Sequence, residues 1–110
     1  MKYIITESKL NKLIFRYLDY QDLIIIDKGR NVYFVNSEGD RYSKIRYDKN
    51  TELCHIDMNL IDIISSLFFT GNWRLAEEPI KRWVEDTLQM NVYSIIPSDT
   101  SNDFRLRVNN

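Results

Sequence analysis

The chain has 110 residues, of which 44% are apolar and 13% aromatic, and it carries a formal net charge of −1. This length allows one hydrophobic core, and this apolar content excludes a globally disordered chain. The near-neutral charge lacks the basic excess that a dedicated nucleic-acid-binding protein carries.

The first predicted elements are a short strand and an amphipathic helix. Lys2–Ile5 is a β-prone run, and Thr6 follows at a position that suits a helix N-cap. Apolar residues then recur at the spacing of one helical face: Leu10, Leu13, Ile14, Tyr17 and Leu18. Charged residues occupy the opposite face, so we expect a surface helix with one buried stripe.

From Leu23 the helical repeat gives way to the alternation that is typical of strands. Four segments rich in Ile, Val, Tyr and Phe follow, separated by short turn sequences: Leu23–Asp27, Asn31–Asn36, Arg41–Tyr47 and Glu52–Asp57. Connections this short join antiparallel neighbours, which predicts a four-stranded meander. Tyr42, Lys44 and Arg46 share one face of the third segment. We therefore expect one side of the sheet to face solvent and the other to be covered by helices.

Two further amphipathic helices are predicted after the sheet. Apolar residues at helical spacing occur on both sides of a break at Thr70–Asn72. Asp57 or Asn59 can cap the first of these helices. Pro79 is best tolerated in the first turn of the second helix. Trp73–Ala76 can form a separate turn that precedes it.

The C-terminal residues are predicted to add one or two strands. Asn91–Ile96 is a β-prone run that ends at Pro97, and a polar segment follows. Apolar and basic residues alternate from Phe104 to Val108, as in an edge strand. We predict one α+β domain over residues 1–97, in which three helices pack on one face of a mainly antiparallel sheet. Residues 98–110 are predicted to form a polar link and an edge strand or a tail that reaches a partner.

The sequence contains no pattern typical of a catalytic or metal site. Cys54 and His55 are adjacent in a predicted strand, so they point to opposite faces and cannot form a nucleophilic pair. A single cysteine excludes an internal disulfide, and one cysteine with one histidine is too few for an ordinary zinc site. Several carboxylates can in principle supply an acid and a base or a magnesium site: Asp57, Asp62, Glu77, Glu78, Glu85 and Asp86. Helix starts and a solvated helix face explain them more simply. We therefore expect no enzyme activity, no cofactor and no metal.

The residues best suited to contact a partner are aromatic or basic and are predicted to be exposed. They lie near the break between the later helices and on the predicted solvent face of the sheet: Trp73, Arg74, Tyr33, Tyr42, Lys44 and Arg46. An exposed tryptophan is a common interface anchor. The sheet members of this set also suit a module that stacks single-stranded nucleic acid. A protein that binds a small ligand is a third interpretation, and it requires a deep pocket.

Three segments of the chain carry a resemblance: MKYIITESKLNKLIFRYLD at the start, IDIISSLFF in the first of the later helices, and RWVEDTLQMNV in the second. Together they resemble small uncharacterised proteins encoded by marine bacteriophages and marine metagenomic viral contigs. The resemblance carries no assigned activity or site residues. It implies a small virion or assembly component, or a protein that binds a host factor, and hence a protein partner from the phage or the host. A homo-oligomer is a further expectation, and nucleic acid is not favoured as a partner.

The expected location follows from this resemblance and from the charge pattern. Charged residues occur too early for a signal peptide. The longest wholly aliphatic run, Leu23–Ile26, is much shorter than a membrane helix. We therefore expect the protein in the host cytoplasm or in the virion, and not in a membrane.

Overall fold

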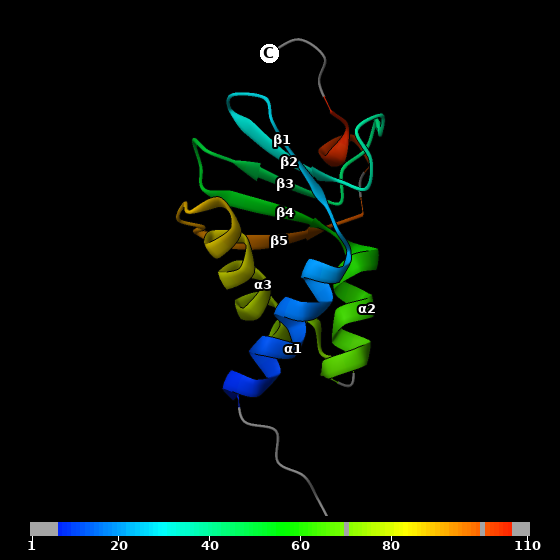
Figure 1. The fold of residues 1–110 in the computed structure, drawn as a ribbon, viewed down its shortest axis with the longest axis vertical. Coiled ribbons are helices and arrows are strands. Elements are labelled where there is room, and N and C mark those ends of the chain that lie inside the picture. The colour runs from blue at the N-terminus through cyan, green and yellow to red at the C-terminus, as the bar shows by residue number, and fades with distance from the viewer. Residues whose placement is uncertain (1–6, 70, 100, 107–110) are drawn as a thin grey trace, which may run out of the picture.

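The computed structural model describes residues 7–69, 71–99 and 101–106, which form a five-stranded mixed sheet with three α-helices on one side (Figure 1). The elements in chain order are α1 (Glu7–Tyr20), β1 (Ile24–Asp27), β2 (Asn31–Val35), β3 (Ile45–Asp48), β4 (Leu53–Asp57), α2 (Met58–Phe68), α3 (Trp73–Leu88), β5 (Ser94–Ser98) and a 3₁₀ turn, η1 (Ser101–Phe104). This architecture confirms the predicted α+β fold class. The predicted strand at residues 2–5 and the cap at Thr6 lie outside the described residues.

The sheet has the strand order β1-β2-β3-β4-β5. Strands β1 to β4 form the predicted antiparallel meander, because the connections between them are short turns. Strand β5 is parallel to β4, since the helix pair α2–α3 carries the chain back to the end of the sheet where β4 begins. One row of side chains on the inner face runs across four strands: Val32, Tyr47, Cys54 and Ile95.

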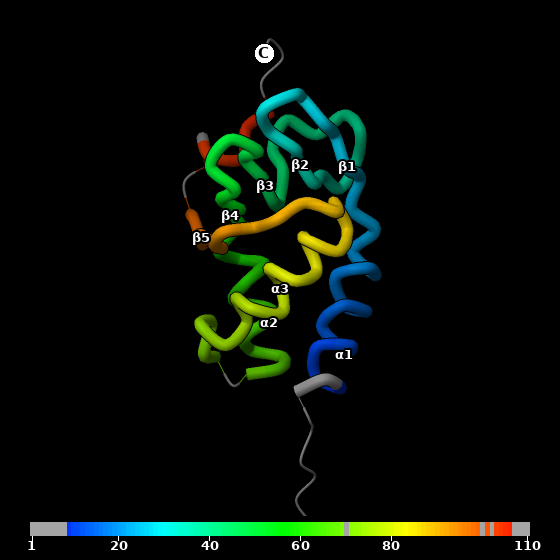
Figure 2. The backbone as a smooth tube through the Cα atoms, turned by 90° about the vertical axis from the view of Figure 1, so that its left-hand side faces the viewer, coloured from blue at the N-terminus to red at the C-terminus, as the bar shows by residue number. Residues whose placement is uncertain are grey.

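The hydrophobic core lies between this inner face and the helices. Its helical part consists of the stripes expected from the sequence: Ile14, Leu18, Leu60, Ile61, Ile64, Ile80, Trp83 and Val84. Burial of each such side chain stabilises the fold by ~1.5–3 kcal/mol. The Trp83 and Phe34 rings lie 5.5 Å apart, and the Trp83 indole donates a 2.9 Å hydrogen bond to Asp19 Oδ1. These contacts tie α3 to the sheet and to α1, which lies next to α3 in Figure 2 and between α2 and α3 in Figure 1.

The helix starts agree with the sequence at α2 and differ from it at α3. Asp57 caps α2 through its side chain, as predicted. Helix α3 begins at Trp73, with Asn72 as its N-cap, so Pro79 lies inside the helix. The expectation that Pro79 lies in the first turn is therefore wrong. Pro79 cannot donate to the Leu75 carbonyl, yet the helix continues through this position to Leu88 with the proline ring buried.

Part of the outer face of the sheet is covered as well, contrary to the expectation that this face is exposed to solvent. Tyr33 and Val35 of β2 point to this face, and both are buried. Turn η1 packs against β3 and β4 on this face and buries Phe104 there. The backbone N–H and the hydroxyl of Ser43 both donate to the Phe104 carbonyl, at 2.7 and 3.1 Å. The expectation of a sheet with one solvent-exposed side is therefore wrong, because residues 101–106 cover part of that side.

Candidate functional site

Two neighbouring hollows lie at the end of the sheet where α2 begins. The larger has a volume of 430 Å³ and is lined mostly by polar residues, whereas the smaller has a volume of 150 Å³ and is lined by both kinds, with Tyr17, Leu23, Leu60 and Ile63 forming its apolar wall. Both are lined by the same four residues: Asn36, Lys44, Asp57 and Asn59. The hollows therefore adjoin, and we call the two together the end groove.

A salt bridge separates the two halves of the end groove. Lys44 Nζ lies 3.7 Å from Asp57 Oδ2. The two residues face each other across β3 and β4, because the Asp57 N–H donates to the Lys44 carbonyl at 2.9 Å. The same carboxylate caps α2 by accepting from the Asn59 N–H at 3.1 Å. The charge pair is therefore held in place by the sheet and by the helix.

The polar half of the groove is bordered by a loop that Asp40 fixes. Asp40 accepts hydrogen bonds from the Ser37 hydroxyl and N–H, at 2.9 and 3.0 Å, and from the Asn36 N–H at 3.1 Å. The hydroxyl contact, followed by the backbone contacts, lowers the pKa of Asp40. Tyr42 is exposed beyond this loop, and its backbone forms an isolated antiparallel bridge with Arg105. An exposed aromatic ring thus lies at the polar end of the groove.

The apolar half of the groove opens onto an exposed surface of α1 and α2. Tyr17 and Ile63 line this half, and the Tyr17 ring packs edge-to-face on Phe68 at 6.1 Å, which joins the two helices. Four large apolar side chains near this contact are exposed: Leu13 (41%), Tyr20 (89%), Ile63 (48%) and Leu67 (61%). Leu13 and Tyr20 flank Tyr17 on one face of α1, and Leu67 lies one turn after Ile63 on α2. We call these four residues the helix patch.

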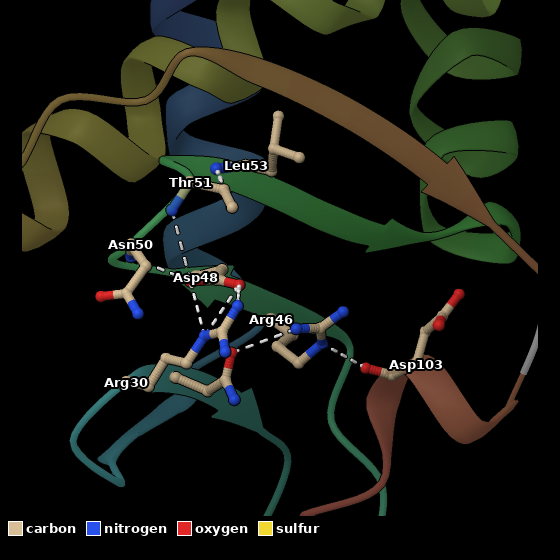
Figure 3. A network of polar contacts seen from close by, with 8 residues as sticks. Arg30, Arg46, Asp48, Asn50, Thr51, Leu53 and Asp103 are labelled. Atoms are coloured by element: carbon tan, nitrogen blue, oxygen red, sulfur yellow. Dashed lines mark hydrogen bonds and ion pairs between the residues drawn. The ribbon is translucent and has the colours of Figure 1, made fainter.

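The basic residues of the outer sheet face take part in an internal polar network (Figure 3). Arg46 donates to the Asp103 carbonyl at 2.6 Å and to Asn31 Oδ1 at 3.1 Å. Asp48 is only 6% exposed and accepts from Arg30 Nη2 at 3.1 Å. Burial alone would raise the pKa of Asp48, but the hydrogen bonds from Arg30 and the following turn outweigh it and lower the pKa. Arg46 therefore joins the strands to the C-terminal turn, whereas Arg30 and Asp48 join the β1–β2 turn to the end of β3.

The residues predicted to contact a partner do not form one surface. Tyr33 is 1% exposed, so its predicted exposure is wrong, and its ring cannot stack on a base. Tyr42 and Lys44 both line the end groove. Trp73 is half-buried at the start of α3 and packs against the core, and the Arg74 guanidinium lies 5.7 Å from the centre of its indole.

The helix patch was missed because its leucines belong to the helical apolar stripes. Leu13 and Leu67 recur at core spacing, so the pattern assigns them to the interior. In the fold they lie at the edges of those stripes, beyond the reach of the neighbouring helix. The sequence does carry one indication of this exposed surface. The apolar residues of α2 cover more of its circumference than one packed helix can bury, because Ile63 and Leu67 widen the apolar face.

The strongest candidate nucleophile is inaccessible. Cys54 is fully buried in the core, and this burial raises the pKa of its thiol to about 12. His55 points to the opposite face, as predicted, and burial followed by the charge of Arg46 lowers its pKa. Within residues 7–69, 71–99 and 101–106, no group of three or more His, Cys, Asp or Glu residues is placed to hold a metal ion. Over the same residues, no helix is long and apolar enough to cross a membrane.

No protein-family model, curated protein or solved structure matches this chain. Function is therefore inferred from the end groove and the helix patch. The two share Ile63, so they form one continuous surface at the junction of α1, α2 and the sheet.

Proposed function

We propose that this protein binds a partner protein through the helix patch and the adjoining end groove, without catalysis or a cofactor. The observation that carries the proposal is the exposure of four large apolar side chains beside an apolar hollow and a fixed charge pair. Contiguous exposed apolar surface with a polar border is typical of protein interaction sites.

The charges around the helix patch define the kind of partner that fits. Lys12 and Arg16 lie beside Leu13 on α1 and are exposed, and no salt bridge to either is formed within the described part of the chain. Two adjacent helices that present apolar residues form a groove for the apolar face of a third helix. An amphipathic helix with acidic residues on the side of its apolar stripe that faces Lys12 and Arg16 matches the patch and its basic border on α1. The exposed carboxylates Asp19 and Asp62 adjoin other parts of the patch, so the acidic residues of the partner should lie only along the Lys12 and Arg16 side. One apolar side chain of that helix would occupy the 150 Å³ hollow.

The resemblance to marine phage proteins suggests where the partner comes from. A virion or assembly component would use this surface to contact another phage protein. A host-directed protein would use it to contact a bacterial factor. Both roles need the same exposed surface, so the identity of the captured protein distinguishes them.

The proposal is tested by partner capture from infected cells with matched variants. The tagged wild-type chain is compared with the double variant Ile63→Asp and Leu67→Asp, and co-purified proteins are quantified by mass spectrometry. Leu75→Asp is the control, because Leu75 is 54% exposed on α3 and lines neither hollow. We expect a partner that is retained by the wild type and the control and is lost from the double variant.

A captured protein counts as support only after direct measurement with the purified partner. We expect the double variant to bind at least about tenfold more weakly, a loss of about 1.4 kcal/mol. Affinity should also fall with added salt, since Lys12 and Arg16 face acidic residues in the proposed complex. A partner that binds the wild type and the double variant equally would rule out the helix patch as the binding surface.

A further inference from the structure

The one histidine of the chain lies next to the C-terminal turn of the fold. His55 is the middle residue of β4, and Cys54 before it points into the core, so the imidazole is on the outer face of the sheet. Arg46 of β3 and Ile96 of β5 are its direct neighbours across the sheet. Turn η1 packs against β3 and β4. His55 therefore lies where the sheet and η1 meet.

One nitrogen of this imidazole is closed off from solvent and has nothing to bind. Nδ1 of His55 is buried, and no hydrogen-bond partner for it exists among the described residues. A neutral imidazole can leave one nitrogen as an unused acceptor, whereas an imidazolium carries an N–H on both nitrogens. Protonation would therefore place an unbonded, charged N–H in a site that excludes water, which is costly.

The charge directly opposite His55 is positive and is held in place. The Arg46 guanidinium donates to the Asp103 carbonyl of η1 at 2.6 Å and to Asn31 Oδ1 at 3.1 Å, so it joins the sheet to the turn (Figure 3). It cannot move away from an imidazolium without giving up both bonds. Arg46 therefore opposes protonation of His55 while η1 is docked.

Two carboxylates nearby favour the imidazolium, but both are bound to other groups. Asp103 accepts from the Ser98 hydroxyl, and Asp48 accepts from Arg30 Nη2. Burial, followed by the charge of the fixed guanidinium, lowers the pKa of His55 against the smaller, opposing effect of these two carboxylates. The docked turn therefore favours the neutral imidazole.

The remaining charged residues around this contact leave that balance unchanged. Lys44 and Asp57, on the same face of β3 and β4, form a salt bridge with each other. Strand β5 (Ser94–Ser98) contains no charged residue. Asp99 and Arg105 flank η1 and are exposed to solvent. The balance therefore rests on the buried nitrogen, the guanidinium and the two bound carboxylates.

We propose that protonation of His55 releases η1 from the outer face of the sheet, so that residues 101–106 form a pH-dependent cover. Release lets water reach Nδ1 and frees the Arg46 guanidinium, and the imidazole then takes up a proton at its ordinary pKa of about 6.5. A base whose pKa is lower in the docked state weakens docking as the pH falls. Docking is therefore strongest above about pH 7 and weakens from there to about pH 5.

Release of η1 changes the surface beside the end groove. Phe104 is 5% exposed when docked and also lines the polar half of the groove, so opening the cover exposes an aromatic ring and widens that half. His55 lines neither hollow. The cover is therefore a separate device, and it stands whether or not the helix patch binds a partner.

The first test is hydrogen exchange of the full chain, followed by NMR at about pH 7.5 and about pH 5.5, a window above the titration of the carboxylates. Each rate is divided by that of an unstructured chain at the same pH, which gives a protection factor. The Ser43 and Leu106 amides report docking, because they donate to the Phe104 and Arg41 carbonyls at 2.7 and 2.8 Å. The Asp57 amide, bonded across the meander at 2.9 Å, is the control.

We expect the protection of both reporter amides to fall about twofold or more between the two pH values, while that of the control is unchanged. An equal loss at all three amides would show that acid weakens the whole sheet, and it would overturn the proposal, as would no loss at the reporters. The imidazole is followed in the same samples. A His55 pKa at or above about 6.5 in the folded chain would also overturn the proposal.

The second test uses two variants that act on the charge alone. His55→Gln keeps a polar side chain and cannot titrate, so protection of the reporter amides should be the same at both pH values. Asp103→Asn keeps an acceptor for the Ser98 hydroxyl and the carbonyl that Arg46 uses, but it removes an anion that favours the imidazolium. Its loss of protection should therefore exceed that of the wild type.

Circular dichroism of both variants verifies that the chain is folded. Reporter amides that still lose protection in His55→Gln would assign the pH dependence to another group and overturn the proposal. A smaller loss in Asp103→Asn than in the wild type would contradict the charge balance on which it rests.

Discussion

Replacing the buried carboxylate of Asp48 by alanine should destabilise the fold without touching the proposed binding surface. Asp48 ends β3 on the outer face and accepts from the N–H of Asn50 at 2.9 Å and of Thr51 at 3.4 Å, which holds the turn into β4. It also pairs with Arg30 at 3.1 Å. Removing this side chain deletes the acceptor that both the turn and the guanidinium use.

The expected loss in the free energy of unfolding is about 1–2 kcal/mol. The Arg30 side chain is largely exposed, so solvent screens the ion pair and its share is below about 1 kcal/mol. Asn50 and Thr51 are also exposed, so water replaces part of the lost hydrogen bonding. A domain with a stability of about 5–15 kcal/mol remains folded after this loss.

Urea unfolding followed by tryptophan fluorescence measures this loss against two controls. Asp48→Asn keeps an oxygen acceptor for the turn and removes the charge, so it should cost about half as much as Asp48→Ala. Asp27→Ala removes an exposed carboxylate that pairs with Lys49 at 2.8 Å and accepts from the Gly29 N–H at 2.9 Å, and because it is solvated this change should cost less than Asp48→Ala, about 0.5–1 kcal/mol. An Asp48→Ala variant no less stable than Asp27→Ala would refute the reasoning.

The same carboxylate gives the stability a pH dependence with a defined sign. The pKa of Asp48 in the folded chain is lowered below 3.8, the ordinary value for an aspartate, so folding favours the charged form. Its contribution is therefore fully present above about pH 5 and is lost as the pH falls through the lowered pKa. The stability difference between the wild type and Asp48→Asn should shrink below pH 3.8. A difference that stays constant in strong acid would contradict this assignment.

Three further outcomes follow from buried contacts. Trp83→Phe should lower the free energy of unfolding in urea by about 2 kcal/mol, because it removes both side-chain volume and the hydrogen bond to Asp19. Asp19→Asn keeps an acceptor for the indole N–H and should lower the free energy of unfolding by less than about 0.5 kcal/mol. Cys54 should resist a thiol reagent at about pH 8 until urea unfolds the chain, since its pKa is raised to about 12; rapid labelling of the folded protein would contradict its burial. Phe104→Ala should cost about 3 kcal/mol and abolish hydrogen-exchange protection of the Ser43 amide; protection that persists would argue against the outer-face contact.

Local sequence features predicted most of the elements. Strands β1, β2 and β4 lie within predicted segments, and Asp57 caps α2 as expected, because alternation and capping depend on neighbouring residues. Strand β3 is shorter than predicted. Ser43 in that segment is instead bound to the carbonyl of Phe104, a residue that is distant in sequence.

The buried outer face could not be derived from local pattern alone. The run Val32–Val35 has four consecutive apolar residues, which is typical of a strand covered on both sides. This run of apolar residues was the only feature of the sequence that indicated a covered outer face. The residue that supplies the cover, Phe104, begins the alternation that predicted an edge strand up to Val108. In the structure Phe104 instead ends the 3₁₀ turn η1, and only Arg105 forms an isolated bridge, with Tyr42; residues 107–110 lie outside the described part of the chain.

The candidate surface depends on relations between elements that one chain does not encode locally. The Lys44–Asp57 pair follows from the register of β3 against β4. The exposure of Ile63 and Leu67 depends on how much of α2 its neighbour covers. The sequence therefore selected Lys44 and Tyr42 as candidate contact residues, but it did not indicate the apolar surface on the other side of the Lys44–Asp57 salt bridge.

The dependence of the outer sheet face on Phe104 also affects biosynthesis. A nascent chain leaves the ribosome from its N-terminus, so Tyr33 and Val35 emerge well before the turn that shields them. During that interval the half-made sheet displays an aromatic and aliphatic surface that invites chaperones or aggregation. A stop codon placed ahead of residue 101 would therefore yield an aggregation-prone product and not simply a shorter one.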